Sequence, residues 1–352
     1  MTLSPALFQK TLLAWFDRHG RKTLPWQINK TPYRVWISEM MLQQTQVSTV
    51  IPYFERFMQR FPDLITLANA DDNDVLHLWA GLGYYSRARN IHRAAKMILN
   101  EYQGKFPDTS QSLQTLPGIG QSTAGAILSI AYQQPAPILD GNVKRVLSRL
   151  HGISDPINDK ATETRLWELA NRYTPKKRVA DYTQAVMDLG ATFCTRNKPA
   201  CERCPFMKPC VAYQQDRVAL IPAKKTARKI PTRKATFLIL KKGNQILLLK
   251  RPPVGIWGSL FSLPEIPGEP ELAAIRDFCQ QQFRFSVIAF QALKPFRHTF
   301  SHYRLQIFPV LIECKKAPLK AMEDSEQIWY NLLDPESVGL PKPVQTILRG
   351  LI

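Results

Sequence analysis

The chain has 352 residues, 45% of them hydrophobic, which is enough for two domains with separate cores. Its 47 Lys and Arg residues against 28 Asp and Glu give a formal net charge of +19, which indicates a polyanionic partner, either nucleic acid or an acidic membrane surface. No apolar run approaches the roughly 20 residues of a membrane span, and no export signal pattern opens the sequence. We therefore expect a cytoplasmic protein with no membrane partner, whose cysteines stay reduced.

Up to about Gln215 the sequence predicts one amphipathic helix after another, separated by short polar turns. We expect a mostly α-helical domain over residues 1–215. Its clearest helical runs are residues 35–61, 74–102, 122–132 and 142–151.

Glu39 lies in the first of these runs, where most of its neighbours are apolar. A carboxyl beside Trp36, Met40 and Leu42 would be desolvated, and desolvation raises the pKa of a carboxyl toward neutrality. A surface glutamate is the commoner case for a helical Glu, so this residue alone decides nothing.

The segment Leu116-Pro117-Gly118-Ile119-Gly120 precedes the run that begins near Ser122. Two glycines let the backbone N–H groups of a turn approach a phosphate, and the following helix N-terminus adds a favourable dipole. The same segment also fits a plain connection between two helices, and both interpretations stay open.

Asp140 opens the next run and fits the N-cap of a helix, which would fix its carboxylate and hold it ionised. One carboxyl kept protonated and one kept ionised suit the acid-assisted cleavage of an N-glycosidic bond. The leaving base needs a proton, and the cationic sugar needs a negative partner. Glu39 and Asp140 together therefore favour this chemistry.

Four cysteines follow the spacing C-x6-C-x2-C-x5-C, and this density predicts a metal site. The four are Cys194, Cys201, Cys204 and Cys210. A single C-x2-C hook favours an iron–sulfur cluster over a zinc ribbon, although spacing alone leaves zinc open. Arg196 and Lys198 on the same loop would lie against the phosphate backbone of a nucleic acid. At the hairpin, the backbone at Gly118 and Gly120 would contact the phosphates.

Residues 216–234 predict a basic linker, because Arg217 to Lys234 carries seven basic residues and two prolines but no acid. From residue 235 the hydrophobic period changes to two. We expect a hairpin around a Lys-Gly-Asn turn and a further strand near residues 302–313. A smaller α+β domain over residues 235–352 follows from this pattern.

The chain resembles the MutY family of adenine DNA glycosylases, a branch of the helix-hairpin-helix superfamily that also contains endonuclease III. The resemblance covers nearly the whole chain. It is carried by residues 23–27, 36–47 and 81–85, the hairpin LPGIGQSTAGAI, the segment LDGNVKRVL, residues 187–190 and the four cysteines. It implies a [4Fe-4S] cluster at residues 194–210, and a monomer acting on flipped adenine in duplex DNA, opposite 8-oxoguanine or guanine. It also implies a bacterial, nucleoid-associated enzyme.

The resemblance implies a role for individual residues as well. Glu39 matches the general acid, Asp140 the carboxylate that stabilises the oxocarbenium ion, and Asn142 a residue that orients phosphate and water. The adenine pocket is matched by Trp26, Gln27, Leu42, Val47 and Gln184, and the residues wedged into the DNA by Gln44 and Tyr84. Lyase relatives carry a lysine where this chain has Ser122, which favours a monofunctional glycosylase over an endonuclease III-like glycosylase/lyase.

The second domain resembles the MutT-like (Nudix) fold that MutY proteins append. The expected Nudix helix, residues 271–282, lacks the paired carboxylates that hold magnesium, so nucleotide hydrolysis is not expected. Phe300, Ser301 and His302 match the family loop that probes the oxidised guanine. A third hypothesis is a protein that binds damaged DNA without catalysis. Such a protein would not need Glu39 and Asp140 as a pair.

Overall fold

The computed structural model describes residues 3–223, 230–284, 286–314, 326–335 and 337–351. The chain divides into two compact units. Unit 1 comprises Met1–Asn69 and Asn90–Thr226, and unit 2 comprises Ala70–Arg89 and Ala227–Ile352. Residues 70–89 thus group with unit 2, although they lie within the expected helical domain by sequence. Part of the expected linker, residues 224–229, lies outside the described residues. Among the described helices, none is long and apolar enough to cross a membrane.

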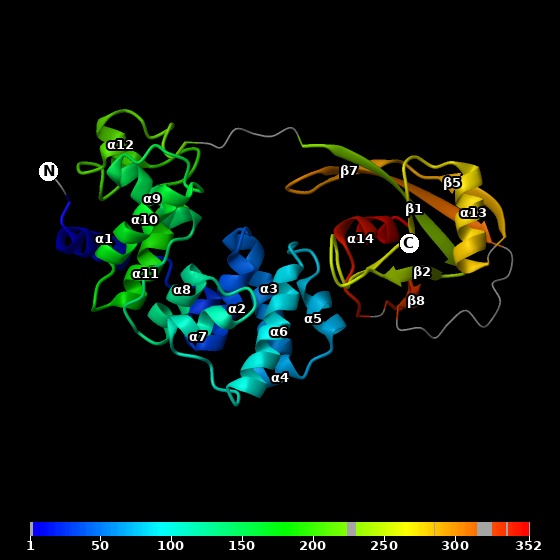
Figure 1. The fold of residues 1–352 in the computed structure, drawn as a ribbon, viewed down its shortest axis with the longest axis horizontal. Helices are drawn as coiled ribbons and strands as arrows, with labels where there is room; N and C mark the ends of the chain where they lie inside the picture. The colour runs from blue at the N-terminus through cyan, green and yellow to red at the C-terminus, as the bar shows by residue number, and fades with distance from the viewer. Residues whose placement is uncertain (1–2, 224–229, 285, 315–325, 336, 352) are drawn as a thin grey trace. The chain divides into compact units, whose positions relative to one another are not determined.

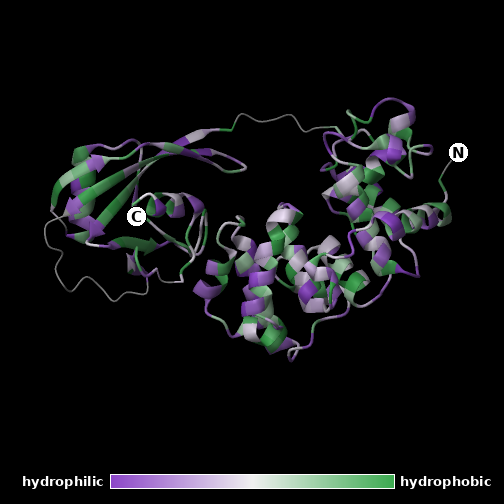
Figure 2. Cartoon of the chain, turned by 180° about the vertical axis from the view of Figure 1, so that it is seen from behind, coloured by the Kyte–Doolittle hydropathy of each residue, from purple (hydrophilic) through white to green (hydrophobic). Residues whose placement is uncertain are grey.

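Unit 1 is helical (Figure 1). Its elements are α1 (Pro5–His19), η1 (Pro25–Gln27), α2 (Pro32–Leu42), α3 (Val47–Arg60), α4 (Leu64–Ala68), α6 (Ser86–Glu101, whose first residues belong to unit 2), α7 (Ser110–Thr115), α8 (Gln121–Ala131), α9 (Gly141–His151), α10 (Lys160–Tyr173), α11 (Val179–Asp188), η2 (Leu189–Phe193, a π-helix), η3 (Cys201–Arg203) and α12 (Val211–Gln214). Hydrophobic and hydrophilic residues alternate along these helices, as their amphipathic pattern requires (Figure 2).

Two of the expected helical runs are wrong in extent. The run over residues 35–61 is broken at Gln43–Gln46 into α2 and α3, and the run over residues 74–102 is broken between α5 (Asp72–Trp79) and α6. Gln44 (φ 57°) and Tyr84 (φ 49°) adopt the left-handed conformation in these breaks, which a helix cannot contain. Neither glycine nor proline marks the first break in the sequence, whereas Gly81 and Gly83 mark the second.

Unit 2 contains an eight-stranded sheet with two further helices, α13 (Leu272–Phe283) and α14 (Lys342–Arg349). Strands follow the order β3-β2-β1-β7-β5, while β4 pairs with β1, β6 with β7 and β8 with β2. The strands are β1 (Thr232–Lys242), β2 (Gln245–Lys250), β3 (Phe261–Ser262), β4 (Glu265–Pro267), β5 (Val287–Ala292), β6 (Phe296–Thr299), β7 (Arg304–Cys314) and β8 (Gln327–Asn331). The expected hairpin is β1–β2, and β1 begins inside the stretch expected as a linker. A helical domain followed by an α+β domain is confirmed as the fold class.

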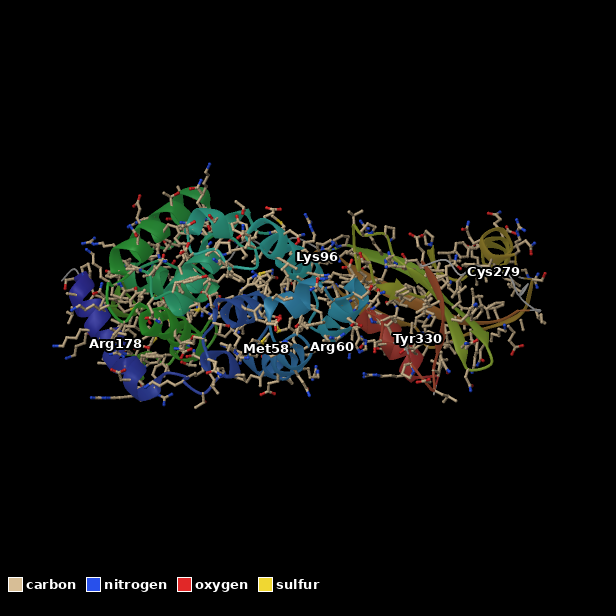
Figure 3. The ribbon with its side chains drawn as sticks, turned by 90° about the horizontal axis from the view of Figure 1, so that it is seen from below. Met58, Arg60, Lys96, Arg178, Cys279 and Tyr330 are labelled. Atoms are coloured by element: carbon tan, nitrogen blue, oxygen red, sulfur yellow. The ribbon has the colours of Figure 1, made fainter. Side chains whose placement is uncertain are left out.

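The core of unit 2 lies between α13 and the central strands. Ile275 and Cys279 of α13 are fully buried against Leu238 of β1 and Ile312 of β7, and Figure 3 marks Cys279 on this helix. Central strands β1 and β7 run parallel from the pair Thr232–Arg304 to the pair Leu240–Ile312. The sheet therefore forms a rigid support for the loops at its ends.

Residues 70–89 belong to unit 2 through contacts with its C-terminal part. His77 Nδ1 lies 3.2 Å from the Val338 carbonyl, and the Tyr85 hydroxyl donates a hydrogen bond to the Leu340 carbonyl at 3.2 Å. A Cβ at Gly339 would lie 2.8 Å from the Leu76 side chain, so the backbone approaches α5 closely. These contacts fix the loop that carries Tyr84 within unit 2.

Candidate active site

Glu39 lies on α2, a helix whose other side chains are mostly buried. Trp36 and Met40, three residues before it and one after it, have no exposed surface. Burial raises the pKa of Glu39 to about 7, and the negative charge of Asp140 is the second, smaller cause. Within the described residues, no group hydrogen-bonds to this carboxyl. A large share of molecules therefore carries a protonated Glu39 at neutral pH.

Asp140 is the N-cap of α9. Its Oδ1 accepts a hydrogen bond from Val143 N–H at 2.7 Å, and its Oδ2 accepts one from Asn142 Nδ2 at 3.2 Å. These bonds lower its pKa, but burial outweighs them, so the pKa of Asp140 is raised. The N-cap expected for Asp140 is confirmed, whereas its ionisation stays a prediction, because burial and these bonds shift its pKa in opposite directions. A negative charge on Asp140 raises the pKa of Glu39, so the two carboxyls disfavour each other's ionisation.

The glycine hairpin joins α7 to α8 close to Glu39. Gly118 has φ 83°, and a Cβ at this position would lie 2.8 Å from Met40 Cε. Gly120 is the N-cap of α8, and a Cβ there would meet nothing within 4 Å. The Ser122 hydroxyl accepts a hydrogen bond from Leu139 N–H at 3.0 Å, which ties the hairpin to the residue before Asp140. The hairpin thus leaves open backbone beside the carboxyl pair.

Two arginines that the sequence analysis missed connect Asn142 to the cysteine segment. Arg145 donates to Asn142 Oδ1 at 2.9 Å, to the Gly190 carbonyl at 2.7 Å and to the Cys194 carbonyl at 2.7 Å. Arg149, which is 3% exposed, donates to the Thr195 carbonyl at 2.7 Å and to Cys194 Sγ at 3.4 Å. Their four-residue spacing on α9 places both arginines on one face of the helix. This spacing is the feature of the sequence from which they could have been identified.

The four cysteine thiols lie close enough to influence one another. Charges on Cys194, Cys201 and Cys210 each raise the pKa of Cys204, after burial as the largest cause. The backbone N–H of Phe206 bonds the Cys204 sulfur and lowers its pKa, as N–H groups around a ligating thiolate do. In the described part of the chain, no three His, Cys, Asp or Glu residues form a ligand set for a single metal ion.

These thiols fit an iron–sulfur cluster. A cubane holds its ligands farther apart than a single ion does, and it favours thiolates that accept N–H hydrogen bonds. Four partly exposed, mutually interacting thiols with N–H donors provide that donor set. Arg196 and Lys198 on the same loop are exposed and available to an anion.

A cavity of about 1090 Å³ opens beside Asp140 in unit 1. It brings together several of the expected residues and the two arginines of α9. Its lining includes Leu42, Gln44, Asp140, Asn142, Arg145, Arg149 and Arg196. A strongly cationic cavity beside a carboxylate is suited to a phosphate-bearing ligand.

Other residues expected around the adenine base lie outside this lining. Trp26 is 5% exposed and packs edge-on against Phe54, with ring centroids 5.5 Å apart. Gln184 is buried, and its Nε2 donates to Asp188 Oδ1 at 2.8 Å. The remaining two are partly exposed: Gln27 and Val47. The cavity therefore gathers Asp140, Asn142 and Arg196 with Leu42 of the expected adenine pocket, but not the other four residues of that pocket.

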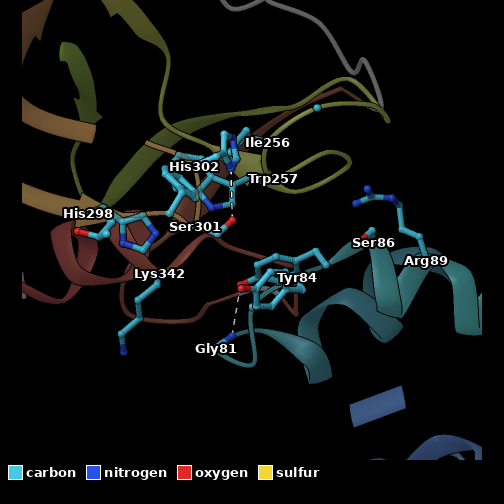
Figure 4. A pocket seen from close by; sticks show the side chains of 15 residues that line it. Gly81, Tyr84, Ser86, Arg89, Ile256, Trp257, His298, Ser301, His302 and Lys342 are labelled. Carbon is cyan, nitrogen blue, oxygen red and sulfur yellow. Dashed lines mark hydrogen bonds between the residues drawn. The ribbon is translucent and has the colours of Figure 1, made fainter. Parts of the chain in front are cut away.

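In unit 2, Tyr84 and the Phe300-Ser301-His302 segment line one pocket of about 600 Å³ (Figure 4). Tyr84 is 46% exposed despite its large ring. The Ser301 hydroxyl lies 3.4 Å from His302 Nδ1, and both residues are exposed. The structure therefore brings together an expected wedge residue and the three expected lesion-reading residues, which are more than 200 positions apart.

Comparisons with known proteins cover both units. Residues 37–172 match the description "HhH-GPD superfamily base excision DNA repair protein", and residues 235–350 match "NUDIX domain". The chain is 42% identical to an adenine DNA glycosylase of Buchnera aphidicola subsp. Acyrthosiphon pisum (strain APS), over 98% of this chain and 97% of that protein. It is 34% identical to the adenine DNA glycosylase of Rattus norvegicus, over 87% of this chain and 70% of that one. Among solved structures, a thermostable thymine-DNA glycosylase is 26% identical with a TM-score of 0.55, covering 60% of this chain and 97% of that chain.

Proposed function

Since the chain belongs to the adenine DNA glycosylases of the HhH-GPD superfamily of base excision DNA repair proteins, we propose that it removes adenine mispaired with 8-oxoguanine or guanine. It acts as a monomer on duplex DNA, and its substrate associates it with the nucleoid in the cytoplasm. The observation that carries the proposal is the carboxyl pair: burial raises the pKa of Glu39 to about 7, and a negative charge on Asp140 adds to this shift.

The reaction follows from these two groups. The adenine must leave the base stack, because its glycosidic bond is unreachable inside the duplex. Protonated Glu39 donates its proton to N7 of adenine, which lowers the energy of the leaving base. The Asp140 carboxylate faces the positive charge that develops on the sugar. Asn142 donates a hydrogen bond to this carboxylate, and Arg145 in turn holds the Asn142 side chain. Deprotonated Glu39 then activates the water that completes hydrolysis.

The surroundings of the site favour a monofunctional enzyme. A lyase needs an amine that attacks the sugar, and the matching position is Ser122, whose hydroxyl already binds Leu139 N–H. Lys144, the nearest lysine to Asp140 in sequence, is engaged by Glu163 with Nζ and Oε1 2.6 Å apart. A glycosylase/lyase of the endonuclease III type is the second candidate, and these two residues speak against it.

We infer that Cys194, Cys201, Cys204 and Cys210 hold a [4Fe-4S] cluster. When bound, the cluster ties the loop thiolates together and so orders the cationic segment between them. Arg145 and Arg149 join that segment to α9 and Asn142. Metal analysis of protein prepared without air should find about four irons per chain. Stoichiometric zinc would overturn the assignment.

The proposed activity is tested by single-turnover strand scission on duplexes with adenine opposite 8-oxoguanine or guanine. The expected product is an intact abasic strand that breaks only after alkali. Strand breakage without alkali would favour the lyase candidate. Complete absence of adenine release, with DNA still bound, would favour a damage-binding protein.

A further inference from the structure

Trp257 lines the pocket of unit 2 that Figure 4 shows. It lies in residues 251–260, here called the tryptophan loop, between β2 and β3. Nothing in the sequence analysis singled out this loop. Its side chain is only 8% exposed, although the loop lies at the pocket wall.

The ring of Trp257 contacts the lesion-reading segment directly. Its centroid lies 5.2 Å from the ring of Phe300 and 5.7 Å from that of His298. On its inner side it meets Phe237 of β1, which has no exposed surface, edge-on at 6.4 Å. The indole therefore stands between the rigid sheet and the ring of Phe300, and pairs of this geometry restrict both rings.

The backbone of the tryptophan loop is held in an unusual conformation. Trp257 has φ 57°, a left-handed value that is uncommon for a bulky residue. Such strain persists only where surrounding contacts determine the conformation, and it concentrates at ligand clamps. Here Arg251 provides these contacts: its Nε donates to the Ile256 carbonyl at 3.1 Å, and its guanidinium lies 5.7 Å from the Trp257 ring. Arg251 is itself fixed by an ion pair with Glu265 at 3.0 Å.

The same loop is tied to the segment that carries Tyr84. Arg89 Nη1 donates to the Gly258 carbonyl at 2.6 Å, and Arg89 follows Tyr84 by five positions. A Cβ at Gly258 would lie 2.6 Å from the Pro253 carbonyl, so this position admits only glycine without a shift. One loop thus supports both walls of the pocket.

We propose that Trp257 is a positioning residue that sets the preference for 8-oxoguanine over guanine by fixing Phe300 and His298. The inference rests on the proposed function, in which Phe300, Ser301 and His302 read the lesion. Hydrogen-bond discrimination at one edge of a base depends on how well the reading groups are held. With the indole removed, Ser301 and His302 keep their chemistry but lose their fixed position.

The test compares the affinities of the full-length protein for two duplexes at fixed salt, with a non-cleavable adenine analogue opposite 8-oxoguanine or guanine. Trp257→Leu should narrow the ratio of the two affinities about tenfold, in line with the loss of one good base contact. Trp257→Phe keeps an aromatic ring against Phe300 and should retain most of the ratio. Phe278→Leu is the matched control, because it removes a ring packed on the core of the same unit, away from the pocket.

A ratio that stays at the wild-type value in Trp257→Leu overturns the inference, and so does an equal narrowing in Phe278→Leu. If Trp257→Leu does not fold, Trp257→Met replaces it, because methionine is large but has no ring. The ratio of the two affinities should narrow in this variant too. If the protein does not read 8-oxoguanine at all, the wild-type protein itself would show no preference between the two duplexes. This result differs from both outcomes above.

Discussion

At the scale of single residues, Glu39 is expected to lower the stability of the fold as the pH rises. Its pKa is 4.5 in the unfolded chain and about 7 in the folded protein, so the folded state binds more protons between these values. Stability should therefore fall through this window. Glu39→Gln has no carboxyl to ionise at this position. Its free energy of unfolding, relative to that of wild type, should therefore rise by up to about 3 kcal/mol from acidic to mildly alkaline pH.

Urea denaturation of both proteins from about pH 4 to about pH 8 measures this difference. Because any fixed effect of the amide is the same at every pH, only the change in the difference counts. A difference that does not vary with pH would mean that Glu39 is not desolvated in solution.

Ser122 carries the second residue-scale prediction. Ser122→Lys places an amine where lyase relatives have one, so borohydride should trap more covalent protein–DNA complex than with wild type. The substitution also removes the acceptor for Leu139 N–H, so a lower melting temperature is expected alongside. Ser122→Ala is the control, since it removes the same acceptor without adding an amine. Equal trapping by the lysine and alanine variants would contradict the assignment.

At the scale of elements, the two hairpin glycines should differ in what they affect. Gly118→Ala forces a left-handed alanine against Met40 and should cost about 2 kcal/mol of folding stability. Gly120→Ala meets nothing in the protein and should fold normally, but its methyl group stands where the backbone approaches a phosphate. The melting temperature and the DNA affinity of both variants are measured: Gly118→Ala should lower the melting temperature, and Gly120→Ala should lower the affinity for DNA. Weaker folding of Gly120→Ala with unchanged DNA binding would refute this division of roles.

The sequence predicted elements better than their ends. Runs such as residues 142–151 carry a clear cap and period, and α9 begins and ends where these predict. The break at Gln44 was hidden, because neither glycine nor proline marks it, whereas Gly81 and Gly83 marked the break at Tyr84 and were not used as a turn signal. The burial of Asp140 could not be predicted for a related reason: an N-cap can be recognised in a sequence, whereas burial depends on elements that are distant along the chain.

At the scale of the whole molecule, the proposed function assigns lesion reading and bond cleavage to residues of different units. Replacing Ser301 and His302 with Ala should weaken capture of adenine opposite 8-oxoguanine much more than opposite guanine, by about 1–3 kcal/mol. 8-Oxoguanine differs from guanine at its C8 oxygen and its N7 hydrogen, and the Ser301 and His302 side chains can form hydrogen bonds with these atoms. The affinity ratio at fixed salt measures the effect. An unchanged ratio would assign lesion reading to another part of the protein.

Motifs located the carboxyls, the cysteines and the lesion-reading segment, but the supporting contacts needed the fold. Arg145 and Trp257 lie within otherwise ordinary helix and loop sequence, and only tertiary structure brings them to Asn142 and Phe300. The grouping of residues 70–89 with unit 2 likewise depends on contacts with residues some 250 positions later. Patterns with a local period can be read from a sequence, whereas partners distant along the chain cannot.

The central claim is that Glu39 delivers the proton that releases adenine. The most direct test is the single-turnover rate of adenine release opposite 8-oxoguanine by Glu39→Gln, with affinity for the same duplex measured in parallel. Glutamine keeps the shape of the side chain but has no proton to give, so the rate should fall at least ~100-fold while binding persists. Release at a rate near that of wild type would contradict the account.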